Sequence, residues 1–193
     1  MTTRREQVLD AAIAVLGAQG VRGVTHRAVD AAAGVPAGTT SNHFRTRDAL
    51  FAGVVDRFVE RERAAAQELA EGAAPTSPRQ LARVLADFAV TATTVRRDVT
   101  LARFALLVEA AHRPHLQRRL GAAAADVTRW AIGWLTAAGS RHPERDAALL
   151  GSQMDAMTLH QLAYPDPGFD PLATLTVLVD VIIAPGRARS GSR

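Results

Sequence analysis

The stretch GVPAGTTSNHFRTRDAL, residues 34–50, concentrates small hydrogen-bonding side chains in an alanine-rich chain of 193 residues. It contains four Ser or Thr hydroxyls, one carboxamide and one imidazole, and Arg47 adds a fixed positive charge. Groups of these types bond phosphate oxygens and base edges, so their chemistry suits recognition of a nucleic acid. The alternative is an ordinary turn followed by a capped helix, and the flanking elements bear on the choice.

The residues before this stretch follow a helical pattern. Apolar residues at helical spacing between positions 8 and 16 predict a first helix that Gly20 ends. Thr25 has the side chain of an N-cap for a second, short helix, which runs to about Ala33 and is closed by Gly34. Two helices are therefore expected before the polar stretch.

A turn at residues 35–37 and a brief helix that ends by Phe44 complete the pattern. Two short helices joined by a turn that contains glycine form a helix-turn-helix, whose second helix enters the major groove of DNA. The methyl groups of Ala37 and the threonines can meet thymine methyls, and Phe44 and Leu50 are expected to anchor the unit in its core.

The residues expected to contact DNA lie at the start of the second helix, in the turn, in the brief helix and just before the next long helix. They are Thr25, His26, Arg27, Pro36, Ala37, Gly38, Thr39, Thr40, Ser41, Asn42, His43 and Arg47. For His26 and Arg27, exposure to solvent without any DNA contact is an equally good interpretation.

Beyond this unit the pattern is helical throughout. Thr46 is expected to cap a long helix over residues 46–72, and the segment AAPTSP after it contains Ser77 as N-cap and Pro78 as first residue of the next helix. Further helices are predicted at 78–96, 99–112, 114–138, 143–163 and 171–184. Asp170 is expected to cap the last of these. The segment TLTVLVDVII within it is also compatible with a strand.

These elements define an all-α fold with about nine helices. We expect a helix-turn-helix DNA-binding domain at residues 1–52, a linking helix at 46–72, a ligand-binding and dimerisation domain at 73–186 and a disordered tail at 187–193. The chain has no Cys, and all 23 of its basic residues are Arg. The absence of a long uncharged apolar run predicts no membrane partner and a cytoplasmic location.

The N-terminal quarter of the chain resembles the DNA-binding domain of the TetR family of transcriptional repressors. The resemblance covers residues 5–52, from REQVLDAAIAV to FRTRDAL. The matching positions are Ala11-Ala12, Thr25, Ala33-Gly34-Val35, Gly38, His43-Phe44, Arg47-Asp48 and Leu50.

The chain departs from the family pattern at two places. Thr40-Ser41-Asn42 stands where the family has Leu-Tyr-Tyr or Leu-Tyr followed by another residue, so Ser41 or Asn42 must replace the tyrosine that holds a backbone phosphate, or DNA affinity is lower. Asp30 stands where the family prefers a small residue, and a carboxylate there is tolerated at the rim of the motif but repelled if it faces DNA.

The resemblance implies a ligand-responsive regulator, most simply a repressor, that binds a palindromic double-stranded DNA operator as a homodimer and is released by a small-molecule effector. It also implies that the last two helices pair across the dimer axis. The apolar content of these helices is consistent with that pairing. The expected interface residues are Leu150, Met154, Leu175, Leu178, Val179 and Ile182.

An effector pocket is expected among aromatic, Leu and Met side chains of the C-terminal part. Its candidate residues are Phe88, Phe104, Leu107, Trp130, Trp134, Met154 and Met157. Each of these side chains also fits a plain hydrophobic core. Asp180, within an apolar run, is open to three roles: a solvent-facing residue, a dimer contact or a pocket group.

The remaining alternatives concern function. No sequence pattern for catalysis, a cofactor or a metal is present; the spacing of His112 and His115 is compatible with a metal, but Pro114 between them favours solvated histidines at a helix end. A helical binding module with a weakened DNA-binding unit is the second hypothesis, and a helical enzyme is the third.

Overall fold

The computed structural model describes residues 2–71 and 74–183 of the chain. Within these residues the chain is all-α, as predicted, with nine helices and no strand. The helices are α1 (Arg4–Gly23), α2 (His26–Ala33), α3 (Thr39–His43), α4 (Arg47–Glu71), α5 (Pro78–Thr93), α6 (Arg97–Ala111), α7 (Pro114–Ala137), α8 (Pro143–Ala163) and α9 (Pro171–Ile183). The expected tail at 187–193 lies outside the described residues.

The predicted N-caps are confirmed. Each cap side chain accepts a hydrogen bond from the backbone N–H three residues later, which satisfies a donor that the first helical turn leaves open. The pairs are Thr25 with Ala28 at 3.1 Å, Thr46 with Ala49 at 3.1 Å, Ser77 with Gln80 at 3.3 Å and Asp170 with Ala173 at 3.0 Å. Helix α9 settles the interpretation of TLTVLVDVII as helical.

Three helix boundaries differ from the prediction by two residues or more. Gly20 has a φ of 69° and breaks the path of α1, but a short helical turn follows it, so α1 extends to Gly23. Helix α5 ends at Thr93, because the N–H of Arg96 bonds the carbonyl of Thr91 at 2.8 Å in a turn. Helix α6 consequently begins at Arg97, two residues earlier than expected.

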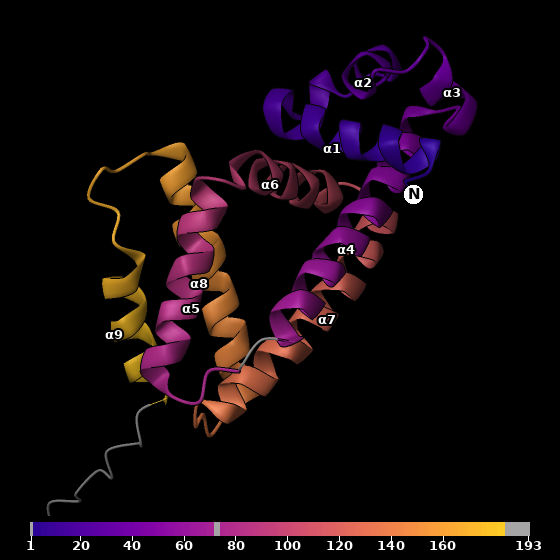
Figure 1. The fold of residues 1–193 in the computed structure, drawn as a ribbon. Coiled ribbons are helices and arrows are strands. Elements are labelled where there is room, and N and C mark those ends of the chain that lie inside the picture. Colours follow the sequence, from indigo (N-terminus) through magenta and orange to yellow (C-terminus); the bar gives the residue numbers. More distant parts are fainter. Residues whose placement is uncertain (1, 72–73, 184–193) are drawn as a thin grey trace, which may run out of the picture.

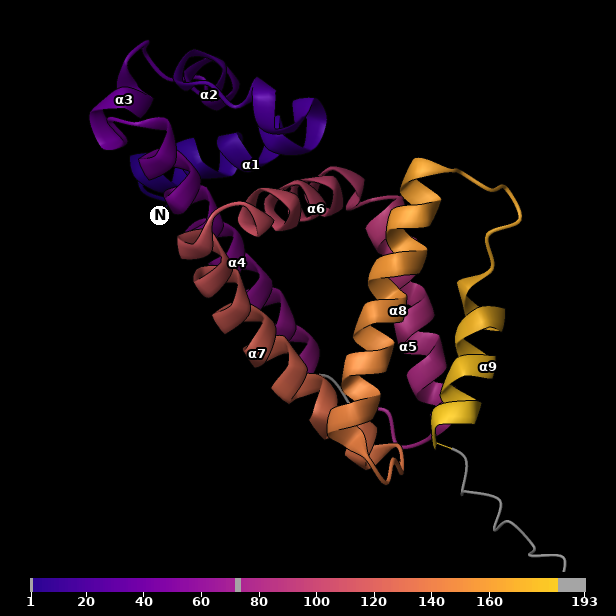
Figure 2. The same ribbon diagram turned by 180° about the vertical axis from the view of Figure 1, so that it is seen from behind.

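The helices form three groups in space. Helices α1, α2 and α3 lie together above α6, helices α4 and α7 run side by side, and α5, α8 and α9 make up the third group (Figures 1 and 2). Helices α4 and α7 run in the same direction, since the residues joined by ion pairs follow the same order along both helices. These pairs are Asp48 with Arg113, Asp56 with Arg119, and Arg63 with Asp126.

Two hydrophobic cores stabilise these groups. The first joins α1, α2 and α4 to α6 and the start of α7, with Leu9, Phe51, Leu106 and Leu116 all fully buried. The second joins α5, the end of α7, α8 and α9. Helix α6 therefore packs on the N-terminal helices although it follows α5 in the sequence. Among the described residues, no helix is both long and apolar enough to cross a membrane.

Helices α1 and α6 approach each other closely at Gly17. A Cβ atom at this position would lie 2.1 Å from the backbone carbonyl oxygen of Asp98 and 2.7 Å from its carbon. Such distances are far inside van der Waals contact, so only glycine fits between these two backbones.

Candidate nucleic-acid interface

Helices α2 and α3 form the expected helix-turn-helix (Figure 1). Helix α2 ends at Gly34, whose φ of 63° is left-handed, and the N–H of Val35 bonds the carbonyl of Asp30 at 3.1 Å. Gly38 has a φ of 90° and is the N-cap residue of α3. Both glycines occupy backbone conformations that residues with a Cβ rarely adopt.

The core anchors of the motif are confirmed. Phe44 and Leu50 are buried in the first core, and the ring of Phe44 packs so closely on Gly53 that a Cβ there would lie 2.7 Å from Phe44 Cε1. A bidentate ion pair joins α1 to α4, since Arg57 Nε and Nη2 each lie 2.9 Å from an oxygen of Asp10. The hydrogen bonds from Arg57 lower the pKa of Asp10.

Most of the predicted contact residues are at the surface. The exposed ones are Thr25, Arg27, Pro36, Ala37, Ser41, Asn42, His43 and Arg47, while His26, Gly38 and Thr39 are half-buried. The exposed part of α3 therefore presents an amide, an imidazole and a serine hydroxyl, with a methyl group from the preceding turn. These are groups that can contact base edges in the major groove.

Two hydroxyls in α3 already donate hydrogen bonds to backbone carbonyls. The hydroxyl of Thr39 donates to the carbonyl of Pro36 at 2.6 Å, and that of Ser41 donates to the carbonyl of Gly38 at 2.9 Å. A hydroxyl has one proton, so both oxygens can only accept further hydrogen bonds in this conformation. They therefore suit the amino groups of adenine and cytosine, whereas phosphate oxygens, which also accept, need donors from elsewhere.

Exposed arginines can provide such donors. Arg47 is exposed, but one of its nitrogens donates to the carbonyl of Val21 at 2.8 Å, and its guanidinium lies 5.4 Å from the centre of the Phe51 ring. Arg45, directly after Phe44, is exposed and lies outside the ion pairs of the described residues. Arg45 is not among the residues predicted to contact DNA, although its position directly after the brief helix is a usable signal.

The prediction that Thr40 contacts DNA is wrong. Thr40 is fully buried, and its hydroxyl and backbone N–H both donate to Asp30. Asp30 is 5% exposed and also accepts from the N–H of Gly38 at 2.8 Å, so its carboxylate points into the motif and away from the surface. Burial raises the pKa of Asp30, but the hydrogen bonds from Thr40 and Gly38 outweigh it and the net pKa is lowered.

The structure also corrects the expectation for His26. Its Nε2 lies 2.6 Å from the carbonyl oxygen of Phe44, so the ring is half-buried and joined to the end of α3. Because a carbonyl only accepts, Nε2 carries the proton of this hydrogen bond. His26 is therefore neither a solvated residue nor an exposed phosphate donor at this nitrogen.

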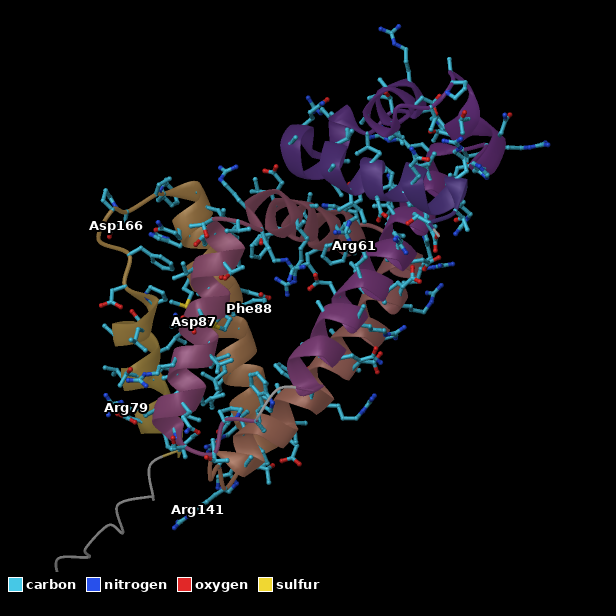
Figure 3. The ribbon with its side chains drawn as sticks, in the orientation of Figure 1. Arg61, Arg79, Asp87, Phe88, Arg141 and Asp166 are labelled. Atoms are coloured by element: carbon cyan, nitrogen blue, oxygen red, sulfur yellow. The ribbon has the colours of Figure 1, made fainter. Side chains whose placement is uncertain are left out.

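The seven predicted pocket residues do not form one group. Trp134 and Met154 are buried in the second core, and Trp130 and Met157 pack against it. Two others are exposed: Leu107, and Phe88 at 44%, which lies on the side of α5 that faces α4 (Figure 3). Phe104 is half-buried on α6. Trp134 and Met154 thus match the core interpretation of these residues.

Trp130 differs from the other members of this group. Its indole ring lies 3.8 Å from that of Trp134, centre to centre, and its Nε1 is buried without a hydrogen-bond partner among the described residues. A buried N–H without a partner is uncommon and marks a place where a ligand atom or water can bond.

Four of the six predicted dimer-interface residues lie inside the chain, so the prediction is corrected for those four. Leu150, Met154, Leu175 and Val179 are buried inside the chain, and Leu178 and Ile182 pack against the same core. These side chains pack in the second core because they form the most apolar faces of α8 and α9. Asp180 is exposed, so it lies outside this core.

Other groups with metal or catalytic potential are dispersed. His112 and His115 are exposed, and the described residues contain no cluster of three or more His, Asp or Glu side chains that could hold a metal ion. The exposed face of α3 is thus the most complete assembly of recognition groups described above.

A helix-turn-helix joined to a larger helical domain defines a class of DNA-binding regulators, and comparisons with known proteins agree. Residues 8–54 match the family described as "Bacterial regulatory proteins, tetR family", and residues 76–185 match "Tetracyclin repressor-like, C-terminal domain". The chain belongs to the TetR family of transcriptional regulators. A search of curated proteins gives no match.

Solved structures share the whole fold. A transcriptional regulator from Rhodococcus sp. Rha1 is 25% identical, with a TM-score of 0.76 over 93% of this chain and 96% of the other. A TetR family member from Streptomyces coelicolor A3 is 30% identical, with a TM-score of 0.66 over 94% and 99%. The multidrug binding protein EbrR in complex with imidazole is 31% identical, with a TM-score of 0.63 over 97% and 99%. EbrR also has structures in complex with ethidium and proflavin.

Proposed function

We propose that this TetR-family regulator is a repressor that binds a palindromic operator as a homodimer and leaves it when a small molecule binds. The exposed face of α3, with Asn42 and His43, and the exposed Arg27, Arg45 and Arg47 carry the DNA-binding part of the proposal. In this arrangement α3 lies in the major groove and the arginines bond phosphates. Two such units at half-sites one helical turn apart, about 34–36 Å, contact one palindrome.

The test starts with selection of duplexes from a random-sequence library by the purified protein. A repressor of this type enriches a palindromic site, and the enriched duplex placed across a promoter lowers transcription in vitro when the protein is added. Failure to enrich any duplex at moderate salt would contradict DNA binding, and enrichment of a site without two-fold symmetry would contradict the dimeric mode.

Arg45 and Asn42 are expected to contribute to DNA binding in different ways. Replacing Arg45 with Gln should weaken binding to all duplexes and reduce the slope of log affinity against log salt by about 1, because one phosphate contact is lost. Replacing Asn42 with Ala should leave that slope unchanged and cost about 1–3 kcal/mol for the selected site alone. Fluorescence anisotropy at four salt concentrations measures both, and equal slopes for the two variants would refute the assignment.

The homodimer is proposed to form through a face of α8 and α9 other than the predicted one. Positions 149, 152, 156, 159 and 163 form one helical stripe on α8, and all five side chains are exposed. On α9, Val177 and Val181 are 66% and 73% exposed and one helical turn apart. Exposed valines and leucines along α8 and α9, which both pack on α5, are suited to burial against the same face of a second copy.

The effector is proposed to be a flat aromatic compound that binds beside Trp130. Support comes from the similarity to EbrR and from Trp130, whose buried indole N–H has no hydrogen-bond partner among the described residues. Binding there is proposed to favour a dimer whose two helix-turn-helix units no longer match the operator spacing. Inverting operator occupancy from 99:1 to 1:99 requires the compound to prefer that state by about 5.5 kcal/mol.

Ethidium is a suitable probe for this site because the chain has only two tryptophans, Trp130 and Trp134. We expect ethidium to quench the tryptophan fluorescence in a saturable manner. Trp134→Phe should keep most of the quenching, because Trp130 is the more accessible ring, and Trp130→Phe should lose most of it. Quenching that survives Trp130→Phe and disappears in Trp134→Phe would place the compound elsewhere.

A further inference from the structure

Helix α2 holds the short helix α3 at both of its ends. His26 and Asp30 are four residues apart on α2 and therefore project from the same face. His26 bonds the carbonyl of Phe44, just after the end of α3, at 2.6 Å. Asp30 accepts hydrogen bonds at the start of α3, from the N–H of Gly38 at 2.8 Å and from the N–H of Thr40 at 2.7 Å.

The N-terminal end of α3 depends on the carboxylate of Asp30. Helix α3 has five residues, too few to be stable by itself, and its N-cap residue Gly38 has no side chain with which to cap it. Asp30 supplies the capping carboxylate from the neighbouring helix instead. Its negative charge also lies at the positive end of the helix dipole of α3. The backbone carbonyl of Asp30 meanwhile bonds Val35, so one residue fixes the turn and the helix that follows it.

Asp30 and Thr40 depend on each other. Both are buried, and the hydroxyl of Thr40 donates to the same carboxylate oxygen that accepts its N–H. They are also two of the positions at which the sequence departs from the family pattern, and here those two departures are in direct contact. A buried carboxylate that loses a donor is costly, whereas an apolar pair of matched volume can replace a buried polar pair.

We propose that Asp30 and His26 are positioning residues for DNA recognition, with the buried Asp30–Thr40 pair setting the position of α3 on α2. Neither residue touches DNA; they act through Asn42 and His43, whose side chains lie on the exposed part of α3. This inference rests on the proposed function, because the selected duplex contacts α3. The hydrogen bonds themselves can be tested without DNA.

Amide hydrogen exchange provides the DNA-independent test. In the full-length wild type the N–H groups of Gly38 and Thr40 should be protected, and in Asp30→Ala both should exchange much faster while amides in the second core keep their protection. Asp87→Ala, which removes an exposed carboxylate from α5, is the matched control and should change neither amide. Unchanged protection at both amides in Asp30→Ala would overturn the proposal.

Binding to the duplex selected by the wild type provides the functional test. Asp30→Ala should weaken binding about tenfold with an unchanged salt slope, because no phosphate contact is removed. The double variant Asp30→Ala/Thr40→Leu, which replaces the polar pair by an apolar one, should recover most of that loss. The proposal is overturned if Asp30→Ala binds like the wild type, or if the double variant binds no better than Asp30→Ala.

Thr40→Val keeps the proposal testable if Asp30→Ala does not fold. It removes only the hydroxyl at nearly constant volume and should weaken binding about threefold, again at constant salt slope. Wild-type affinity together with wild-type protection of the Gly38 amide would overturn the proposal. If the wild type selects no duplex at all, the proposed function fails, and amide exchange alone still decides whether Asp30 holds α3.

Discussion

Replacing Gly17 with alanine is expected to lower the free energy of unfolding by about 3 kcal/mol. The added methyl group would meet the backbone carbonyl of Asp98 at 2.1 Å, and backbone atoms cannot turn away as the end of a side chain can. Helices α1 and α6 must therefore separate, which opens the first core between them. Urea unfolding followed by circular dichroism, at one protein concentration, measures the loss.

Gly133→Ala is the matched control for this prediction. Gly133 also lies within a helix, α7, but a Cβ there would have no atom within 4 Å. Alanine should stabilise this site by up to about 1 kcal/mol, because glycine is a poor helix former. If Gly17→Ala is as stable as Gly133→Ala, the close approach of α1 and α6 is not a feature of the folded protein.

Placing arginine at both Val177 and Val181 is expected to separate the proposed dimer and to weaken operator binding at least 100-fold. Both side chains are exposed on one face of α9, so arginines are tolerated in a single chain but bring like charges together across a dimer axis. The monomer then binds half-sites independently and loses the gain from simultaneous engagement, which is of order 10²–10⁴. Sedimentation equilibrium gives the mass, and gel shifts with full and half-site duplexes give the affinities.

The control for the dimer prediction is Val95→Arg. Val95 is 89% exposed in the turn between α5 and α6, so it belongs to neither of the two exposed faces proposed as the interface. This variant should remain dimeric and bind the full site normally. A wild-type mass for the Val177→Arg/Val181→Arg variant would show that this face of α9 is not the interface, and a monomeric wild type would contradict the dimer itself.

Helix starts could be predicted from the sequence because capping is local. Thr25, Thr46, Ser77 and Asp170 each bond an N–H three residues away, and a short sequence window contains both partners. The anchors of the motif were predictable for a similar reason, since Phe44 is a single large apolar residue between polar neighbours. Local chemistry thus accounts for the fold class and for the helix-turn-helix.

The role of Asp30 could not be predicted in this way. Its partners Gly38 and Thr40 are eight and ten residues away, across a turn, and only the packing of α3 on α2 brings them to one carboxylate. Without that geometry Thr40 looks like one more surface hydroxyl.

Several of the predicted dimer and pocket residues lie in the core for a different reason. Apolar character selects the residues that a chain buries in its own core, such as Leu150, Leu175 and Trp134. An interface or pocket instead needs apolar residues that remain exposed after the core is complete, and Val177 is recognised as one of these only in the fold. Sequence gives the first set directly, whereas the second requires the fold.

The place of α6 in the first core has a consequence for biosynthesis. The DNA-binding helices are made first, but the core beneath them also needs Ala102, Leu106 and Ala110 from α6 and Leu116 from α7. At about 5–20 residues per second, the ribosome supplies these side chains seconds after α4 has emerged. The N-terminal helices consequently complete their packing only after α5 and α6 have left the ribosome, so a nascent chain that stops after α4 presents the helix-turn-helix without its full support.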